Sequence, residues 1–199
     1  MTISELLSLS FAAILGENLV LTRLFGVDAL GKDIKNTALV GGALVPTMAL
    51  SCGVSSLVFN SVLVPARLEQ LQIVVFVAIA AAIAKVMELL FGAVFGKTVG
   101  LFPLLTLNGA LLGAMLTGVG EGLSLVGSLI YGALAALGFD LALFVYHGVK
   151  EKLRLASPNG AFQGAPLAFI AIGLVIMAFM GFGEVEISAV LDVPFKMAG

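Results

Sequence analysis

The feature that most constrains this chain is a series of long apolar stretches separated by short polar connections. Residues 37–59, for example, contain no charged side chain, and a helix needs about 20 mostly apolar residues to cross a bilayer. Of the 199 residues, 60% are hydrophobic and only 11% are charged, whereas soluble domains carry roughly 25% charged residues. We therefore expect an integral membrane protein, and an all-α one because each helix satisfies its own backbone hydrogen bonds.

Six segments are apolar and long enough to be membrane-spanning helices. The connections between them are short and hold most of the polar, glycine and proline residues, so we expect a single transmembrane domain over residues 1–199 and no soluble domain. The N-terminal MTISELL lacks the basic region of a signal peptide, and the first span is expected to remain in the mature protein. The predicted spans are residues 3–27, 37–59, 70–92, 99–118, 122–147 and 166–184.

Lysine and arginine residues in the connections fall unequally on the two sides of such a bundle. Arg67 and Lys196 fall on one side, and six others fall on the opposite side. Cytoplasmic loops carry the excess of positive charge. This predicts a multi-pass protein of a prokaryotic plasma membrane, with both termini outside. The six residues expected on the cytoplasmic side are Lys32, Lys35, Lys97, Lys150, Lys152 and Arg154.

Two asparagines indicate an internal duplication. Asn18 lies in the first predicted span and Asn108 in the fourth, and each of these spans begins a set of three. An odd number of spans inverts the second copy, which predicts two inverted three-helix repeats of about residues 1–97 and 98–199. Glycines flank both asparagines, and Pro103 precedes the second. Because glycine and proline weaken helical hydrogen bonding, both spans are predicted to be broken half-helices. Alternatively, the asparagines and glycines only mediate helix packing.

Four charged side chains inside the predicted spans require a physical reason, because an ionisable group at the bilayer centre costs about 2.5–3.5 kcal/mol. Glu17 adjoins Asn18 in the first span. Lys85 and Glu88 are three residues apart in the third span, so they share a helix face and can pair with each other. Asp140 lies in the fifth span. These groups either line an ion path or polar cavity, or they only fix the packing by pairing with one another or with a partner protein.

The sequence contains no motif for nucleotide binding, zinc-protease chemistry or serine hydrolysis, and the chain alone is not expected to be an enzyme. Its single cysteine, Cys52, excludes an internal disulfide and a CxxC metal site and is expected to be a small apolar residue within a helix. Its only histidine, His147, is expected at a solvated helix end. The net charge of −2 gives no indication of nucleic-acid binding.

Four sequence motifs together resemble the Rnf/Nqr family of membrane subunits. Within the family, the resemblance is greatest to the A-type subunits of Rnf electron-transport complexes, followed by the E-type subunits of sodium-translocating NADH:quinone reductases. It implies six spans, an inverted repeat with two half-helices, and a homologous sister subunit of opposite topology within a redox-driven, ion-translocating complex. The motifs are ENLVLTRLFGVDALG (17–31), LFPLLTLNGALLG (101–113), YGALAALGFDLAL (131–143) and FQGAPLAFIAIGLVIMAFMGF (162–182).

The resemblance also implies a cofactor, and here the sequence departs from the family pattern. The family carries Asn-Asn-x-x-x-x-x-x-x-Gly-x-Cys in the first span and Thr-Asn-Cys in the fourth. Two cysteines of such a protein, together with two of its sister, hold a 2Fe-2S cluster in mid-membrane, which passes electrons between the two faces. In this chain Asp28 occupies the first cysteine position and Gly109, directly after Asn108, occupies the second. Iron–sulfur clusters are held mainly by thiolates, so no cofactor is expected to be bound by this chain.

Three functions remain open at this point. The favoured one is an integral membrane subunit of an Rnf/Nqr-like electron-transport complex without the usual cluster, which supports ion movement or assembly while electrons travel by another route. The second is a cysteine-less paralogue that transports an ion or small solute without redox chemistry. In that case Asp28 and Glu17 form a cation site, since the C-terminal ends of half-helices favour cations. The third is a purely structural membrane subunit. In each, Asn18 and Asn108 shape the helix breaks.

Overall fold

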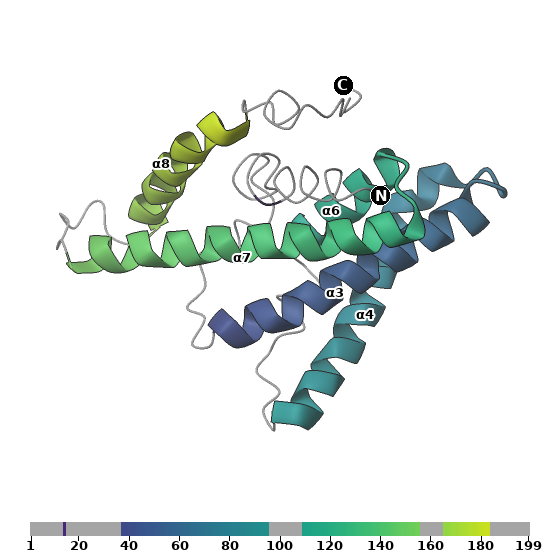
Figure 1. The fold of residues 1–199 in the computed structure, drawn as a ribbon, viewed down its shortest axis with the longest axis horizontal. Coiled ribbons are helices and arrows are strands. Elements are labelled where there is room, and N and C mark those ends of the chain that lie inside the picture. Colours follow the sequence, from purple (N-terminus) through teal and green to yellow (C-terminus); the bar gives the residue numbers. More distant parts are fainter. Residues whose placement is uncertain (1–13, 15–36, 96–108, 156–164, 184–199) are drawn as a thin grey trace. The chain divides into compact units, whose positions relative to one another are not determined.

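The computed structural model describes Ile14 and residues 37–95, 109–155 and 165–183, and every regular element in these residues is a helix (Figure 1). The chain divides into two compact units. One is Ile34–Leu137, and the other combines Met1–Asp33 with Gly138–Gly199. The all-α prediction is confirmed for the described residues.

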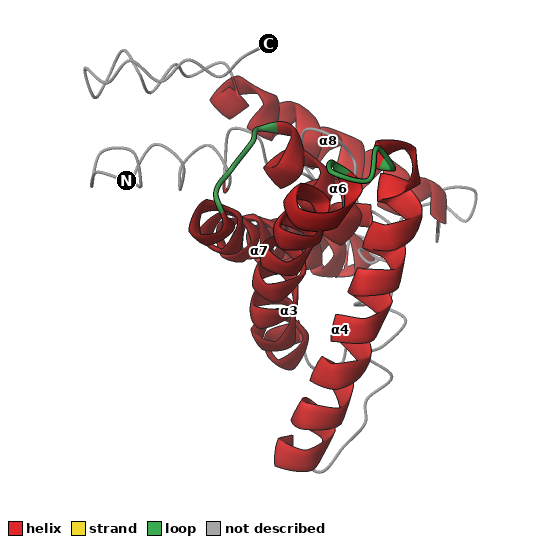
Figure 2. Ribbon diagram, turned by 90° about the vertical axis from the view of Figure 1, so that its right-hand side faces the viewer, coloured by secondary structure: helices red, strands yellow, loops and turns green. Residues whose placement is uncertain are grey.

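The unit Ile34–Leu137 is built on two long helices joined by a short connection. Helix α3 (Thr37–Val58) continues into the π-helix η2 (Phe59–Leu63), and a turn and the 3₁₀ helix η3 (Glu69–Leu71) lead into α4 (Gln72–Phe95) (Figure 2). Near this connection the rings of Phe59 and Phe76 meet edge to face, with their centroids 6.5 Å apart. This aromatic contact ties the start of α4 to the end of the preceding helix.

The π-helix η2 has a local cause in the side chains around it. Asn60 Nδ2 donates to Ser56 O at 2.9 Å, and Ser61 Oγ donates to Leu57 O at 2.6 Å. Side chains that bond the carbonyl four residues back compete with the backbone N–H groups for it. The backbone N–H of Val64 then donates to Phe59 O at 3.0 Å, one residue further back than in an α-helix. The predicted end of this span at residue 59 was therefore too early.

Helix α3 also contains a proline in its interior, Pro46. Proline has no N–H and removes one helical hydrogen bond. The next residue, Thr47, is fully buried, and its hydroxyl donates to Ala43 O at 2.6 Å. Neighbouring hydroxyls of this kind allow membrane helices to tolerate proline.

Helix α6 (Gly109–Gly120) packs against both α3 and α4. Large, fully buried side chains from all three helices form the core of this unit. They are Leu44 and Met48 of α3, Phe76 of α4, and Leu111 and Met115 of α6.

Helix α7 (Leu125–Leu155) begins in the same unit, where it lies very close to α3. Ser124 caps its N-terminus by accepting a hydrogen bond from Gly127 N at 3.2 Å. A Cβ added at Gly132 would lie 2.6 Å from Met48 O and 2.9 Å from Cys52 Sγ. Only glycine allows this approach, so Gly132 and buried Cys52 define the α3–α7 contact.

From Gly138 onward α7 belongs to the other unit, together with α8 (Ala165–Gly183). The connection between the predicted spans 122–147 and 166–184 is helical in its first part, because α7 continues to Leu155. The apolar part of the helix ends at Val145, and the lysine, glutamate and arginine residues that follow are good helix formers. His147 consequently lies inside α7 and not at a helix end as expected.

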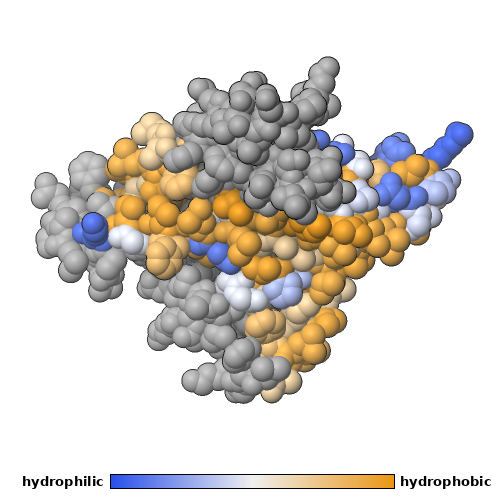
Figure 3. Space-filling model, viewed as in Figure 1, coloured by the Kyte–Doolittle hydropathy of each residue, from blue (hydrophilic) through white to orange (hydrophobic). Residues whose placement is uncertain are grey.

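Three of the described helical stretches are long and apolar enough to cross a membrane: Gly41–Leu63, Glu69–Ala93 and Leu125–Val145. They match the second, third and fifth predicted spans, and α8 coincides with the sixth. Of the fourth, 99–118, only the part from Gly109 is described, and the first, 3–27, lies outside the described residues apart from Ile14. Figure 3 shows a largely apolar surface over the described helices, with polar groups gathered where α3 and α4 are joined. Such a surface fits a membrane protein.

Candidate functional site

The first charged site inside a span is an ion pair on α4. Lys85 Nζ lies 2.8 Å from Glu88 Oε2, as their spacing of three residues predicted. The pair lies within the apolar stretch Glu69–Ala93. In this environment each charge is the counter-ion of the other, which removes the need for an isolated ion.

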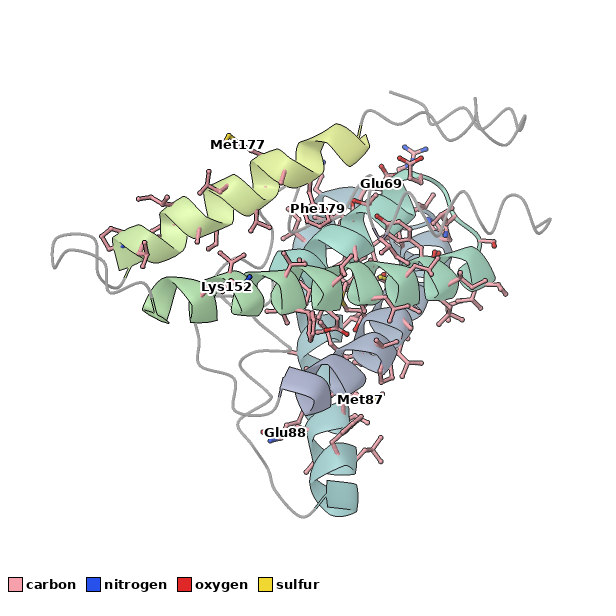
Figure 4. The ribbon with its side chains drawn as sticks, turned by 60° about the vertical axis from the view of Figure 1, so that its left-hand side comes forward. Glu69, Met87, Glu88, Lys152, Met177 and Phe179 are labelled. Atoms are coloured by element: carbon pink, nitrogen blue, oxygen red, sulfur yellow. The ribbon has the colours of Figure 1, made fainter. Side chains whose placement is uncertain are left out.

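The two partners of this pair differ in exposure. The Lys85 side chain is 57% exposed, whereas that of Glu88 is 11% exposed. Figure 4 shows Glu88 and its buried neighbour Met87 projecting to different sides of α4. The cationic end of the pair is therefore the part presented to the surroundings of the helix.

The second charged site is Asp140 in α7, inside the apolar stretch Leu125–Val145. The residue is half-buried, and its neighbours Phe139 and Leu143 are almost fully buried. Its carboxylate oxygen Oδ1 is buried and has no hydrogen-bond partner in the part of the chain that the structure describes. A buried carboxylate oxygen without a partner is costly in apolar surroundings, which makes Asp140 a candidate for the ion path.

Buried hydroxyl groups form a polar feature that the sequence analysis missed. Thr47, Ser51 and Ser55 lie four residues apart on one face of α3 and are fully buried. Ser55 Oγ donates to Cys52 O at 2.9 Å, while Ser51 Oγ has no partner within the described ranges. The spacing of hydroxyl residues by four inside an apolar span is the signal that would have revealed them.

A second set of hydroxyls joins α3 to the loop before α7. Ser56 Oγ donates to Leu123 O at 3.3 Å, and Ser128 Oγ lies 3.4 Å from the same carbonyl oxygen. These contacts hold the start of α7 against the end of α3. Their role is structural, since both hydroxyls are bonded within the protein.

The residues described here do not fit an iron–sulfur cluster. Gly109 is the first residue of α6 and has no side chain to offer. Cys52 is buried in α3 at the contact with Gly132, where its sulfur fills the space between two helices. Over residues 37–95, 109–155 and 165–183, no three His, Cys, Asp or Glu side chains are grouped so as to hold a metal ion. The cluster implied by the family resemblance takes two thiolates from each of two sister subunits, and this chain has one cysteine.

The remaining predicted site residues lie outside the described residues. They are Glu17, Asn18, Asp28 and Asn108, and their predicted roles at the half-helix breaks stay predictions. Gly109, the residue after Asn108, is the first described residue of helix α6. The structure brings Lys85 and Glu88 together and places Asp140 separately on α7.

Comparison with known proteins shows which protein family the chain resembles. The chain matches the profile of a family described as "Rnf-Nqr subunit, membrane protein" over residues 6–185. This match covers most of the chain, including all of the described helices.

Individual relatives are similar over nearly their whole length. The A-type subunit of the ion-translocating oxidoreductase complex of Syntrophotalea carbinolica is 36% identical over 185 residues, which cover 89% of this chain and 96% of that protein. The protein of the same name from Cereibacter sphaeroides is 37% identical over 172 residues, which cover 83% of this chain and 89% of that protein. The corresponding A-type subunit of the Na(+)-translocating ferredoxin:NAD(+) oxidoreductase complex of Acetobacterium woodii is 29% identical over 189 residues, or 92% and 98% of the two chains.

Proposed function

The chain belongs to the Rnf-Nqr family of membrane subunits, and on that premise we propose that it is an integral membrane subunit of an ion-translocating oxidoreductase complex. The observation that carries this proposal is the family match over residues 6–185. The three described helices of membrane-spanning length support it. The subunit works with the other subunits of the complex and not as an enzyme by itself.

The test is to purify the tagged chain from the native membrane and to assay the membrane for coupled transport. Oxidoreductase subunits are expected to co-purify with the chain. Inverted vesicles are then energised by reduced ferredoxin with NAD⁺, and uptake of sodium ions and of protons is measured. Loss of uptake on deletion of the gene, restored by the tagged chain, supports the proposal, whereas unchanged uptake contradicts it.

We further propose the topology of six spans in two inverted repeats, with both termini outside the cell and a homologous sister subunit of opposite topology. Helices α3, α4, α7 and α8 at predicted positions support it. Arg67 lies in the exposed turn before α4, and Lys152 is exposed in the polar end of α7. Arg67→Cys is expected to react with an impermeant maleimide added outside intact cells, and Lys152→Cys only after permeabilisation. The reverse labelling pattern would show the opposite topology, with both termini in the cytoplasm.

Within this function, Asp140 is proposed as a group on the ion path. Its support is the unpaired, buried Oδ1 inside an apolar stretch. The Lys85–Glu88 pair is assigned to assembly, because each of its charges already has a partner. Glu17 and Asp28 remain proposed contributors of negative charge to the path, and their test is ion uptake after Glu17→Gln and Asp28→Asn.

We also propose that this subunit holds no 2Fe-2S cluster of its own. The support is the ligand set, since Gly109 offers no ligand and Cys52 is packed inside α3. Iron analysis and electron paramagnetic resonance of the purified complex test this. A reduced cluster signal that disappears with Asp28→Ala contradicts the proposal, and a signal that does not depend on Asp28 belongs to other subunits.

A second candidate function is an ion or small-solute transporter that uses the same scaffold without redox partners. The observation that favours it is the combination of the missing cluster cysteines with a buried Asp140 oxygen, Oδ1, that has no partner among the described residues. Gene neighbours distinguish the two functions: flavoprotein and ferredoxin-like neighbours favour the complex, and an isolated gene favours the transporter. If the Glu17→Gln and Asp28→Asn variants leave ion uptake unchanged, the result supports a third possibility, a purely structural subunit.

A further inference from the structure

The turn that follows η2 has the hydrogen bonds of a Schellman motif, a common way to end a helix. The N–H of Leu68 donates to Leu63 O at 2.9 Å, five residues back. Inside this bond, the N–H of Arg67 donates to Val64 O at 3.1 Å. In such a motif the residue at the position of Arg67 adopts the left-handed backbone conformation. Arg67 accordingly has a φ of 56°.

Helix α6 ends in the same turn, but with glycine at the left-handed position. The N–H of Leu123 donates to Gly118 O at 3.2 Å. The N–H of Gly122 donates to Val119 O at 3.0 Å, and the φ of Gly122 is 62°. Glycine is the usual residue here, because a Cβ is unfavourable in the left-handed conformation. The chain therefore builds one turn with the favoured residue and the other with Arg67, whose backbone conformation weakens the folded state.

No contact in the part of the chain that the structure describes compensates for this unfavourable conformation. Arg67 is exposed, and its guanidinium has no hydrogen bond or ion pair with the described residues. The apolar stretches on either side of it end at Leu63 and begin again at Glu69. Arg67 therefore lies where the helical hairpin leaves the hydrocarbon region, and a partner for its side chain is to be sought at the membrane surface.

The surroundings of Arg67 combine one cation with exposed apolar side chains. Val64 is 41% exposed, Leu68 is 46% exposed and Leu71 is 48% exposed. This combination is typical of the membrane interface, where acyl chains meet phosphate groups. Arg67 is the only basic residue of this connection and is close in sequence to the acidic Glu69. An acidic protein surface would therefore gain little charge complementarity here.

We propose that Arg67 binds the phosphate of a membrane lipid, and that this contact holds the connection between η2 and α4 at the membrane surface. A guanidinium group presents a planar fork of N–H donors that matches phosphate in a bidentate way. The contact with phosphate offsets the unfavourable backbone conformation, which explains an arginine at a position that favours glycine. This role concerns lipid and is independent of the proposed transport function.

Thermal unfolding of the purified full chain in two environments tests the contact. Dodecyl maltoside contains no phosphate, whereas nanodiscs of phosphatidylglycerol present it at the membrane surface. In the detergent, Arg67→Gly is expected to raise the unfolding midpoint by about 2–4 °C, because glycine relieves the backbone strain. In the nanodiscs the same variant is expected to lower the midpoint by roughly 1–4 °C, because the lost phosphate contact outweighs the relieved strain.

The turn at the end of α6 provides the matched control. Gly122→Ala introduces a Cβ at the equivalent left-handed position but no charge. It is expected to lower the midpoint by about 2–4 °C in the detergent and in the nanodiscs alike. A change of sign between the two environments is therefore expected for Arg67→Gly alone.

Three results overturn the proposal. If Arg67→Gly raises the midpoint equally in both environments, the side chain has no lipid partner. If it lowers the midpoint in both, arginine stabilises the chain without phosphate. If inorganic phosphate added to the detergent reproduces the effect of the nanodiscs, the ligand is free phosphate and not lipid. None of these results affects the proposed function, which is tested by co-purification and ion uptake.

Discussion

Helices α4 and α7 deal with charge in opposite ways. On α4, whose span is mostly exposed, Lys85 and Glu88 form a closed pair within one helical turn. On α7, half of whose apolar window is buried, a single carboxylate has an oxygen without a partner among the described residues. The more exposed helix therefore carries the satisfied charges, and the more buried helix carries the unsatisfied one.

This difference separates two reasons for placing charge inside a membrane. A local ion pair needs no ion from outside and is suited to holding a partner helix, because only its outer end is exposed. An unpaired buried carboxylate is stable only with a proton or a cation. It is therefore suited to binding and releasing one. Each prediction below alters one side of this comparison.

The largest effect is expected at Asp140. Asp140→Asn keeps the size of the side chain but removes the negative charge that holds a cation or proton. Loss of a charged acceptor costs about 1.5–3 kcal/mol, which corresponds to roughly a tenfold to hundredfold loss of ion affinity. Uptake of sodium ions and protons into energised vesicles measures this effect.

Asp140→Glu is the control, because it keeps the carboxylate on the same helix position. It is expected to retain a large share of the uptake, while the amount of assembled complex stays the same in both variants. If Asp140→Asn transports ions at the wild-type rate, the unpartnered oxygen has no role in transport. The charge on α7 then differs from the pair on α4 in structure but not in function.

A smaller effect is expected when the α4 pair is broken on one side. Glu88→Gln removes the charge that Lys85 pairs with on the same helix, and losing a charged hydrogen-bond partner inside the apolar span costs about 1–3 kcal/mol. The double variant Lys85→Met/Glu88→Gln removes both charges and is expected to recover most of this loss, because a neutral pair has no such cost. Thermal unfolding of the chain in detergent measures the difference. Equal stabilities of the single and double variants would show that the two charges are not coupled.

The contact of α7 with α3 gives the next effect. Ala at position 132 would place its Cβ 2.6 Å from Met48 O, which is backbone and cannot move aside. Overpacking costs about 1–3 kcal/mol, and about 1 kcal/mol is recovered from the better helix propensity of alanine. We expect Gly132→Ala to lower stability by up to about 2 kcal/mol and to speed the reaction of Cys52 with a maleimide.

Gly148→Ala on the same helix provides the control for this prediction. A Cβ at position 148 meets nothing within 4 Å, so only the gain in helix propensity remains. Cys52 is expected to stay as unreactive as in the unsubstituted chain. If both alanine variants leave Cys52 unreactive, the burial of Cys52 does not depend on the close contact at Gly132.

The sequence predicted the parts of this fold that depend on hydrophobic length. Helices α3, α4 and α7 lie where uninterrupted apolar stretches predicted them. The Lys85–Glu88 pair follows from helical spacing alone. The ends of helices were less predictable. The π-helix η2 depends on the side-chain hydrogen bonds of Asn60 and Ser61, and the end of α7 depends on helix propensity beyond the apolar stretch that ends at Val145.

The candidate site was predicted only as separate residues. Periodicity identifies a charge in a span but not its surroundings. The difference between the Lys85–Glu88 pair and the Asp140 Oδ1 atom, which has no partner among the described residues, is therefore visible only in three dimensions. The buried hydroxyls of α3 escaped the sequence analysis for a related reason. A serine inside an apolar span has little effect on hydrophobicity, and its burial depends on which helix packs over it.

The smallest effect, at Ser51, tests whether charge is the property that marks the ion path. Ser51 resembles Asp140 in having a buried oxygen without a partner in the described residues, but it is neutral. Ser51→Ala removes an unsatisfied hydroxyl but also leaves a small unfilled space, and because these two terms oppose each other stability is expected to change by less than about 0.5 kcal/mol. Ser56→Ala, the control, loses the bond to Leu123 O and is expected to cost about 0.6 kcal/mol. Both variants are expected to transport ions at the wild-type rate. If Ser51→Ala lowers uptake as strongly as Asp140→Asn, the hydroxyl face of α3 is part of the path, and an unpaired oxygen, charged or neutral, is what marks it.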